Sequence, residues 1–305
     1  MEQNGEGKPK VPIIFDGMVC PRLPPLVKDA KERFEEIRDL PCKKDDVLLV
    51  IYPKSGTHWV WEIVCMLLKK KAEYMKESKE FFFLEAIPDM SVVHNLVSPR
   101  PLNTHVPYRW LPKQHIENGG KIVHVLRNPK DVAVSMYHHF NSTQEFVEPL
   151  DFKTFYEKVF MGPVQVFGGW FSFEKEFEEA EAKDTRSAIL TLHYESLKKN
   201  PIQETKKLAK FLNIDVNDEL IAEIVDKCSF KKLKEATDTV KDFIKIPAVS
   251  EEMKHGGKAK EMMSMLYRKG EIGDWKNHFT VALNEQFDAV FNLEMKDSKI
   301  QVQYE

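Results

Sequence analysis

One short stretch near the start of the chain combines a lysine, two hydroxyl side chains and a glycine. Lys54, Ser55, Gly56 and Thr57 come shortly after residues 47–52 (VLLVIY), a continuous apolar run of strand-forming residues. A turn that leads from a strand into a helix points backbone amides at one spot, and the positive end of the helix dipole adds to them. The stretch therefore predicts a phosphate or sulfate site, with an ordinary strand–helix turn and a surface lysine as the alternative.

The position of the lysine argues against one common class of nucleotide-binding protein. In that class the phosphate loop has lysine directly after the second of two glycines, followed by a hydroxyl residue that binds magnesium. Here Lys54 precedes Gly56, the only glycine of the loop. A kinase or ATPase is therefore disfavoured.

Arg127 and Ser135 are further candidates for anion binding. Arg127 follows residues 121–126 (KIVHVL), a second predicted strand, and ligands of open parallel sheets bind beyond the carboxyl ends of the strands. Asn128 and Pro129 suit a helix cap and the first helical position, and Ser135 comes close to two turns later. We expect both candidates near the first anion site. A surface ion pair for Arg127 and a serine bonded to its own helical turn are the alternatives.

Strands and helices alternate along the chain around these candidates. Residues 188–193 (AILTLH) predict a third strand, and Asn200 followed by Pro201 predicts the start of a helix. Apolar residues at helical spacing predict helices that include 59–68, 170–180, 208–212 and 220–225. The alternation predicts an α/β fold: a single domain over 11–305 with a central parallel sheet flanked by helices and a P-loop-like anion-binding loop, after a loose tail at 1–10.

Composition excludes several other functions. Lys and Arg together number 45 and Asp and Glu number 48, so the net charge of -3 lacks the basic surplus of a nucleic-acid binder. Residues 1–10 lack the apolar core of a signal peptide, and no apolar run approaches the roughly 20 residues that cross a bilayer. We therefore expect a cytoplasmic protein without nucleic-acid or membrane partners.

The four cysteines, Cys20, Cys42, Cys65 and Cys228, indicate free thiols in a reducing compartment. None belongs to a C-x-x-C pair, which leaves a zinc site with little support. Four cysteines are also too few for a disulfide scaffold in a chain of 305 residues. No metal is expected.

Residues 251–262 (EEMKHGGKAKEM) differ from the rest of the chain, with six charges and two adjacent glycines. Such a segment is typical of a solvated surface loop. The alternative is a mobile lid, because Arg268, Lys269 and Gly270 follow soon after it.

Taken together, the motifs resemble those of the cytosolic sulfotransferase family, from about Phe15 to Met295. Six ordered motifs carry the resemblance: YPKSGTHW at 52–59, NTHVP at 103–107, RNPKDVAVSMYHHF at 127–140, YESLKKNP at 194–201, CSFKKLK at 228–234 and RKGEIGDWKNHFTVALNE at 268–285.

The resemblance implies that 3′-phosphoadenosine 5′-phosphosulfate (PAPS) is the sulfuryl donor. It assigns the 5′-phosphosulfate to Lys54, Ser55, Gly56, Thr57, His58 and Trp59. It assigns the adenine to Trp59 and Phe230 on its two faces, with Tyr194 and Ser229 bonding near it. It assigns the 3′-phosphate to Arg127, Ser135, Arg268, Lys269 and Gly270, and two arginines can bind a doubly charged phosphate bidentately.

The catalytic roles implied by the resemblance belong to His105, Lys54 and Ser135. An imidazole near its ordinary pKa, here that of His105, can accept the proton of an acceptor hydroxyl at neutral pH. Lys54 would stabilise the charge on the departing phosphate oxygen, and Ser135 would steer Lys54 between two positions.

The implied acceptor is a small lipophilic molecule with a hydroxyl or, less often, an amine. Candidate acceptor-binding residues are Asn103, Thr104, His105, Phe81, Phe83, Met136, His139, Phe140 and Phe243. Core packing is the alternative for the pocket candidates among them. Apolar pockets discriminate poorly, so the class of acceptor is not predicted.

Two positions depart from the family pattern. The family usually has lysine where this chain has Asn103, and threonine where it has His58. Asn103 removes a positive charge beside the reacting sulfuryl group, so Asn103→Lys is expected to raise turnover. The departure also supports a second hypothesis, a nucleotide-binding protein of this fold with little or no turnover.

A short element near the C-terminus resembles the family's dimerisation motif. Its residues are Lys276, Thr280, Val281 and Glu285, in register after Gly273-Asp274-Trp275. The element predicts a homodimer, with a surface turn before the last helix as the alternative.

Overall fold

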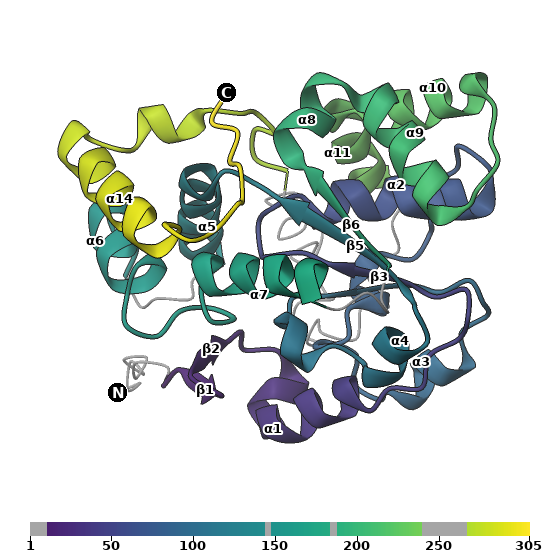
Figure 1. Cartoon of the computed structure of the whole chain (residues 1–305), viewed down its shortest axis with the longest axis horizontal. Coiled ribbons are helices and arrows are strands. Elements are labelled where there is room, and N and C mark those ends of the chain that lie inside the picture. The colour runs from purple at the N-terminus through teal and green to yellow at the C-terminus, as the bar shows by residue number, and fades with distance from the viewer. Residues whose placement is uncertain (1–10, 144–147, 184–187, 240–266) are drawn as a thin grey trace, which may run out of the picture.

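The structure is a computed structural model that describes residues 11–143, 148–183, 188–239 and 267–305. Within these ranges a four-stranded sheet crosses the middle of the molecule in the order β4-β3-β5-β6 (Figure 1). Its strands are β3 (Val47–Val50), β4 (Pro101–Thr104), β5 (Lys121–Leu126) and β6 (Ala188–His193), and each neighbouring pair is parallel. The predicted central parallel sheet is confirmed.

Three of these strands were predicted from apolar runs in the sequence. β5 and β6 have the predicted bounds, and β3 ends two residues before its run does. β4 was not predicted, because Pro-Leu-Asn-Thr is short and half polar. It begins with proline, which has no amide to donate, and it lies at an edge of the sheet, where that is tolerated.

The sequence forms helices on both sides of this sheet. They are α1 (Pro24–Arg38), α2 (Thr57–Lys69), α3 (Ser91–Asn95), α4 (Lys113–Glu117), α5 (Pro129–Ser142), α6 (Phe152–Phe155), α7 (Trp170–Lys183), α8 (Tyr194–Lys199), α9 (Pro201–Leu212), α10 (Asp218–Lys227), α11 (Phe230–Thr239) and α14 (Val281–Glu294). Shorter helical turns are η1 (Lys79–Phe82), η2 (Tyr108–Trp110), η3 (Tyr156–Phe160) and η4 (Asp274–Asn277). An antiparallel hairpin of β1 (Ile13–Phe15) and β2 (Met18–Cys20) precedes α1.

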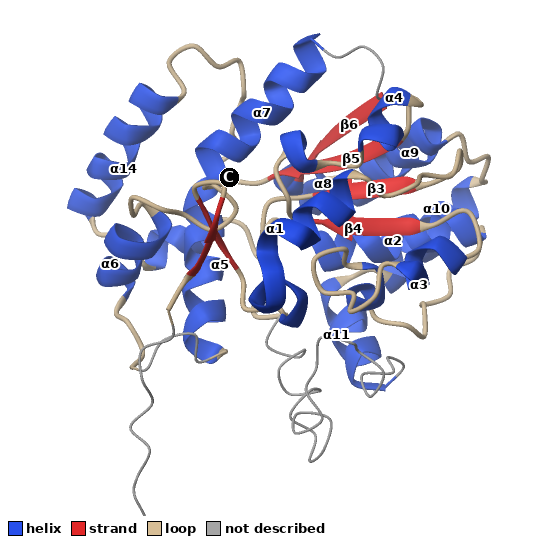
Figure 2. Ribbon diagram, turned by 90° about the horizontal axis from the view of Figure 1, so that it is seen from below, coloured by secondary structure: helices blue, strands red, loops and turns tan. Residues whose placement is uncertain are grey.

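Two buried clusters cover the two faces of the sheet, which explains why its strands are continuous apolar runs. Leu48 and Val50 of β3 belong to one cluster with residues of α1 and α7. Val47 and Leu49 belong to the other with residues of α2, α9 and α10. The alternation follows from the pleat, since successive side chains of a strand point to opposite faces. Figure 2 shows the strands side by side in this order.

Two helices, α5 and α9, begin where the sequence predicts. The Asn128 side chain accepts a hydrogen bond from the Lys130 amide at 2.9 Å, and Pro129 occupies the first position of α5. α9 starts at Pro201, and α2, α7 and α10 contain the predicted apolar stripes. In both views α5, α6 and α14 gather at one end of the molecule, beside the sheet (Figures 1 and 2).

Several predictions about the whole chain can be compared with this fold. No disulfide joins the four cysteines, as expected. Every helix among the described residues is too short or too polar to cross a bilayer. The tail at 1–10, the charged segment at 251–262 and Phe243 lie outside the described residues.

Candidate active site

The loop between β3 and α2 is a tight turn with two residues in the left-handed region. Lys54 has φ 69° and Gly56 has φ 104°. Glycine is required at position 56, because a Cβ there would lie 2.9 Å from the Tyr194 ring. α2 begins at Thr57, and the first amides of a helix have no partner within the helix. The turn therefore has the geometry that favours an anion.

Arg127, at the end of β5, joins this loop to the start of α8. Its Nη1 donates a hydrogen bond of 2.6 Å to the Lys54 carbonyl, and its guanidinium lies 4.1 Å from the centre of the Tyr194 ring. Sequence reasoning expected Arg127 and the Lys54 loop at one edge of the sheet, and the structure brings them into contact.

Two polar atoms of this region are buried without a hydrogen-bond partner among the described residues. They are the Oγ of Ser55, which is fully buried, and the Nε of Arg127. Leaving a buried polar group unpaired costs about 1–3 kcal/mol. Such atoms indicate where a polar ligand would fit, and both belong to predicted anion-binding residues.

Lys54 has other positive charges around it. Burial lowers the pKa of its ammonium group to about 7, and the charges of Arg127, Lys79 and Arg268 act in the same direction. Cations gathered in one place repel one another unless an anion joins them. The electrostatics of this site therefore favour an anionic ligand.

The segment after Tyr267 carries Arg268 and Lys269 into the same region. Both side chains donate to Asp274, each at 2.6 Å. Burial raises the pKa of Asp274, but the hydrogen bonds from Lys269, Asn277 and Arg268 hold it well below the usual range. The charge of Arg268 lowers the pKa of Lys54, as the charge of Arg127 does, so these two predicted 3′-phosphate residues both act on the anion-binding loop.

One face of α5 connects these groups. The Asp131 carboxylate accepts hydrogen bonds from the Gly273 and Trp275 amides at 2.8 and 2.9 Å, which ties the segment of Arg268 to the start of the helix. Ser135 and His139 follow at successive intervals of four residues, which lie on one helix face. The charge of Lys54, then burial and the charge of Lys79, lower the pKa of His139. Ser135 therefore lies on one face of α5 between Asp131, which binds the segment of Arg268, and His139, on which the charge of Lys54 acts.

Aromatic residues surround the loop. Trp59 and Tyr194 meet edge to face with their rings 5.5 Å apart. Phe230, at the start of α11, meets Tyr267 at 6.1 Å and packs so closely on Gly270 that a Cβ there would lie 2.2 Å from the Phe230 ring. The predicted adenine residues thus form two groups on this side of the molecule. Ser229 is exposed, just before α11.

His105, directly after β4, has a fixed orientation. Its Nδ1 lies 2.5 Å from the carbonyl oxygen of Ile51, at the end of β3. A carbonyl only accepts hydrogen bonds, so Nδ1 carries the proton and Nε2 keeps a free lone pair. Burial, the charge of Lys79 and, more weakly, that of Lys54 lower the pKa of His105 to about 3, against the opposite effect of the Ile51 contact. The imidazole is therefore neutral at physiological pH, with Nε2 unprotonated. Its pKa in the free protein is well below the ordinary value that sequence reasoning assumed for this base.

Glu85 holds the same strand end and was missed by sequence reasoning. Its Oε1 accepts a 2.6 Å hydrogen bond from the His105 amide, and Thr104 also bonds to its side chain. Glu85 is fully buried, and burial raises its pKa to about 7, although its hydrogen bonds act against this. The signal was an acidic residue inside the apolar run 81–87.

The two departures from the family pattern contact the same short turn, η1. The Asn103 amide donates to the Lys79 carbonyl at 2.9 Å, and His58 lies 3.5 Å from the Glu80 carboxylate. Asn103 is fully buried, and its Oδ1 has no hydrogen-bond partner among the described residues. Sequence reasoning missed Lys79, since no motif contains it.

The predicted acceptor-binding residues fall into two groups: some are near His105 and others pack elsewhere in the molecule. Phe83 meets the His105 ring edge to face at 5.0 Å, and the charges of Lys54 and His105 act on His139. Phe140 packs on Phe155 at 5.8 Å, and Met136 is 1% exposed in the core. Phe81 packs against the cluster on the α2 side of the sheet.

The predicted dimerisation residues lie on the surface at the start of α14. Thr280 caps the helix by accepting a 3.2 Å hydrogen bond from the Leu283 amide. Val281 is 76% exposed and Glu285 is exposed, while Lys276 pairs with Glu305.

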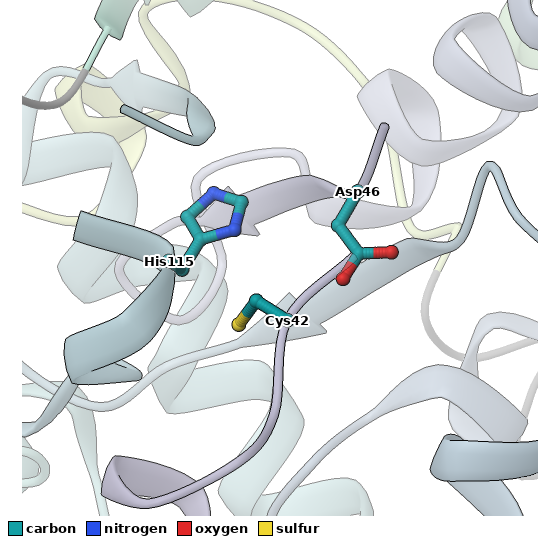
Figure 3. A group of neighbouring side chains, drawn as sticks. All are labelled: Cys42, Asp46 and His115. Atoms are coloured by element: carbon teal, nitrogen blue, oxygen red, sulfur yellow. The ribbon is translucent and has the colours of Figure 1, made fainter. Parts of the chain in front are cut away.

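One group of metal-ligating side chains occurs among the described residues, away from this site. Cys42, Asp46 and His115 have ligand atoms within 4.8 Å of one another (Figure 3). They lie near the amino end of β3, whereas the anion site is at its carboxyl end. Arg100 donates to both oxygens of Asp46, and burial raises the pKa of the Cys42 thiol to about 12. Because the carboxylate is already paired and the thiol stays protonated, we assign this group no metal.

Comparison with known proteins agrees with this arrangement. Residues 44–299 match the family model described as a sulfotransferase domain. Sulfotransferase 1E1 of Bos taurus is 34% identical over 285 residues, which cover 90% of this chain and 92% of the relative. Sulfotransferase 1B1 of Canis lupus familiaris is 34% identical over 292 residues, which cover 92% and 94%.

Solved structures give the same result. A mouse sulfotransferase complexed with PAP has a TM-score of 0.73 and 27% identity, covering 93% of this chain and 95% of that chain. A retinol dehydratase in complex with androsterone and PAP has a TM-score of 0.69 at 20% identity, covering 90% and 87%, and is a likeness of fold alone.

Proposed function

This chain belongs to the sulfotransferase family, and on that premise we propose that it moves a sulfuryl group from PAPS to a hydroxyl, or less often an amine, of a small lipophilic acceptor. The predicted family and the enzyme class, a PAPS-dependent sulfotransferase, are confirmed by its relatives. One observation carries the proposed mechanism: the Ile51 carbonyl fixes the proton on Nδ1 of His105, which leaves Nε2 free as a base.

Donor binding is the first part of the proposal. The unpaired Oγ of Ser55, the amides at the start of α2 and the ammonium of Lys54 suit the 5′-phosphosulfate. Arg127 and Arg268 suit the 3′-phosphate, since both charges act on Lys54 and the Nε of Arg127 has no hydrogen-bond partner among the described residues. Ser135, Lys269 and Gly270 would complete that site. Trp59 and Phe230 would flank the adenine.

The chemical step follows from the order of these groups. The acceptor oxygen attacks sulfur, its proton passes to Nε2 of His105, and the bond from sulfur to the bridging oxygen of PAPS breaks. The electron pair of that bond stays on the departing phosphate, where Lys54 stabilises the added charge. Ser135, on the face of α5 that leads to Lys54, would position that ammonium group.

Phe83 and His139 are the acceptor-binding candidates with the strongest support, because both lie beside the proposed base. The cytoplasm, with its reducing conditions, suits four cysteines that form no disulfide.

A donor assay tests the function directly. The protein is incubated with PAPS labelled in the sulfuryl group and a panel of phenols, alcohols and amines, with labelled ATP as the comparison. We expect label on at least one acceptor from PAPS and none from ATP. Transfer from ATP alone, or binding of PAPS without transfer to any acceptor, would contradict the proposal.

Product binding tests the 3′-phosphate assignment. At 100 times its dissociation constant, adenosine 3′,5′-bisphosphate should add about 2.7 kcal/mol to the free energy of unfolding. At equal concentration 5′-AMP should raise the melting temperature much less. Arg268→Ala should lower the affinity for the bisphosphate by at least about tenfold, because a charge-assisted hydrogen bond contributes roughly 1.5–3 kcal/mol.

The control for Arg268→Ala is Arg22→Ala, which removes an exposed arginine outside the site. Differential scanning fluorimetry with both nucleotides gives the comparison. Equal melting shifts for the two nucleotides with the wild-type protein would refute the assignment.

We also propose a homodimer through Lys276, Thr280, Val281 and Glu285. Val281 is 76% exposed in the single chain and would be buried in the dimer contact. Val281→Glu should therefore convert the dimer to a monomer, because it would bury a charge there. Leu293→Glu, which changes another exposed apolar residue of α14, is the matched control. Light scattering measures the mass, and a wild-type monomer at micromolar concentration would disprove the contact. Activity per chain should be kept in both variants.

A further inference from the structure

Lys79 is a buried cation beside the proposed reaction centre. It belongs to η1, it is 6% exposed, and its ammonium lies 4.7 Å from the centre of the Phe83 ring. The same ring contacts the imidazole of His105 at 5.0 Å. The ammonium of Lys79 and the proposed base therefore contact the same aromatic side chain.

The charge of Lys79 reaches the groups on both sides of the reaction centre. It lowers the pKa of Lys54 in the phosphate loop and the pKa of His105 after β4. It also lowers the pKa of His139 on α5. These three residues come from different elements, and the contacts of Phe83 with both Lys79 and His105 place the ammonium near the proposed base.

Such a position is costly without an anion. Lys79 and Lys54 repel each other, and little water reaches Lys79 to screen its charge. The Glu80 carboxylate lies 3.3 Å from the ammonium and is a single negative charge beside two lysines, so it offsets part of this repulsion. A bound sulfuryl group would bring the missing negative oxygens.

We propose that Lys79 is a second catalytic cation, which contacts the sulfuryl oxygens during transfer while Lys54 stabilises the departing phosphate. This inference rests on the proposed function. Lys79 takes no proton in the step: the acceptor's proton goes to His105 and the electron pair to the departing phosphate. Its contribution is a fixed positive charge at the oxygens that carry negative charge in the transition state.

Asn103 is the positioning residue for this cation. Its amide donates to the Lys79 carbonyl at 2.9 Å, and Leu84 donates back to the Asn103 carbonyl at 3.0 Å. The first bond holds η1 against β4, and the second holds the segment just after η1 against the same strand. The family's usual lysine is absent at position 103. In this proposal Lys79 supplies that positive charge from η1, which Asn103 holds in place.

The test compares Lys79→Met with Lys79→Arg in single-turnover transfer, with PAPS prebound and one acceptor that the wild type uses. Methionine keeps the contact with Phe83 but removes the charge, and we expect the rate to fall at least about tenfold. Arginine keeps the charge and should restore much of the rate. Lys76→Met, an exposed lysine three residues earlier, is the matched control.

A pH measurement separates this role from a structural one. The bisphosphate product should lose affinity above the pKa of Lys54, which is about 7 and which Lys79 helps to lower. Lys79→Met should therefore raise the pH at which this loss begins. Loss of a purely structural contact would lower the melting temperature and leave that pH unchanged. The affinity at pH 6 should change little, since the product has no sulfuryl group.

Asn103→Lys gives an independent outcome. The sequence alone predicts a faster enzyme, but with Lys79 in place the change adds a third ammonium group and removes the bond to η1, so we expect a slower one. If Lys79→Met transfers at the wild-type rate, or Asn103→Lys is faster, the role of Lys79 is refuted while the proposed function stands. If the wild type transfers to no acceptor, both fail.

Discussion

Replacing His105 by alanine should lower the rate of sulfuryl transfer by about 10²–10⁴, the usual contribution of general-base catalysis. The Ile51 carbonyl holds the proton on Nδ1, so the other ring nitrogen is the one available base in the proposed step. Affinity for the bisphosphate product should barely change, because His105 is proposed to act on the acceptor and not on the nucleotide. Single-turnover transfer with donor prebound measures the rate, and calorimetry measures the affinity.

The matched control is His94→Ala, which removes an exposed histidine outside the site. The pH dependence gives a second check. A base must be unprotonated, and the pKa of His105 is lowered to about 3, so its protonation should not slow the enzyme between pH 5 and 7. Transfer by His105→Ala at the wild-type rate would show that His105 is structural.

Lys54→Met should lower turnover by about 10²–10³, as loss of one preorganised donor at a developing oxyanion does, and should also weaken product binding. In the free protein the pKa of Lys54 is lowered to about 7, first by burial and then by the charges of Arg127, Lys79 and Arg268. An anionic ligand favours the protonated form and raises that pKa. Binding therefore takes up a proton above pH 7, and affinity falls as the pH rises, by up to tenfold per pH unit.

Titration calorimetry in buffers of different ionisation enthalpy measures this proton uptake. Lys54→Arg is the control, because arginine keeps its charge at every pH used and should bind without the proton uptake. Lysine, methionine and arginine are all unbranched at Cβ, so the positive φ at this position affects them alike. If Lys54→Met takes up as many protons on binding as the wild type does, a group other than Lys54 is responsible for the uptake.

The sheet and the anion-binding loop could be predicted because local sequence determines them. Residues 47–52 and 121–126 are apolar runs because both faces of β3 and β5 are covered, and the loop follows its strand directly. β4 could not be found in this way. Its residues are half polar because it lies at the edge and because Asn103 and Thr104 bond to η1 and to Glu85.

Lys79 and Glu85 escaped prediction for a different reason. Each acts through a contact between segments 20 or more residues apart: Asn103 to Lys79 across 24 residues and His105 to Glu85 across 20. No helical or strand period links such positions. Their pairing depends on a parallel bridge between Phe83 and Asn103, which only the folded chain reveals.

Asp274 has a consequence for the timing of each catalytic cycle. Its carboxylate already pairs with Arg268 and Lys269, the cations proposed to hold the 3′-phosphate. A bound product would share those two cations with the Asp274 carboxylate. The two cations would therefore attract the product less strongly than they would without Asp274. The affinity given up in this way shortens the residence time of the product and frees the enzyme sooner for the next donor molecule.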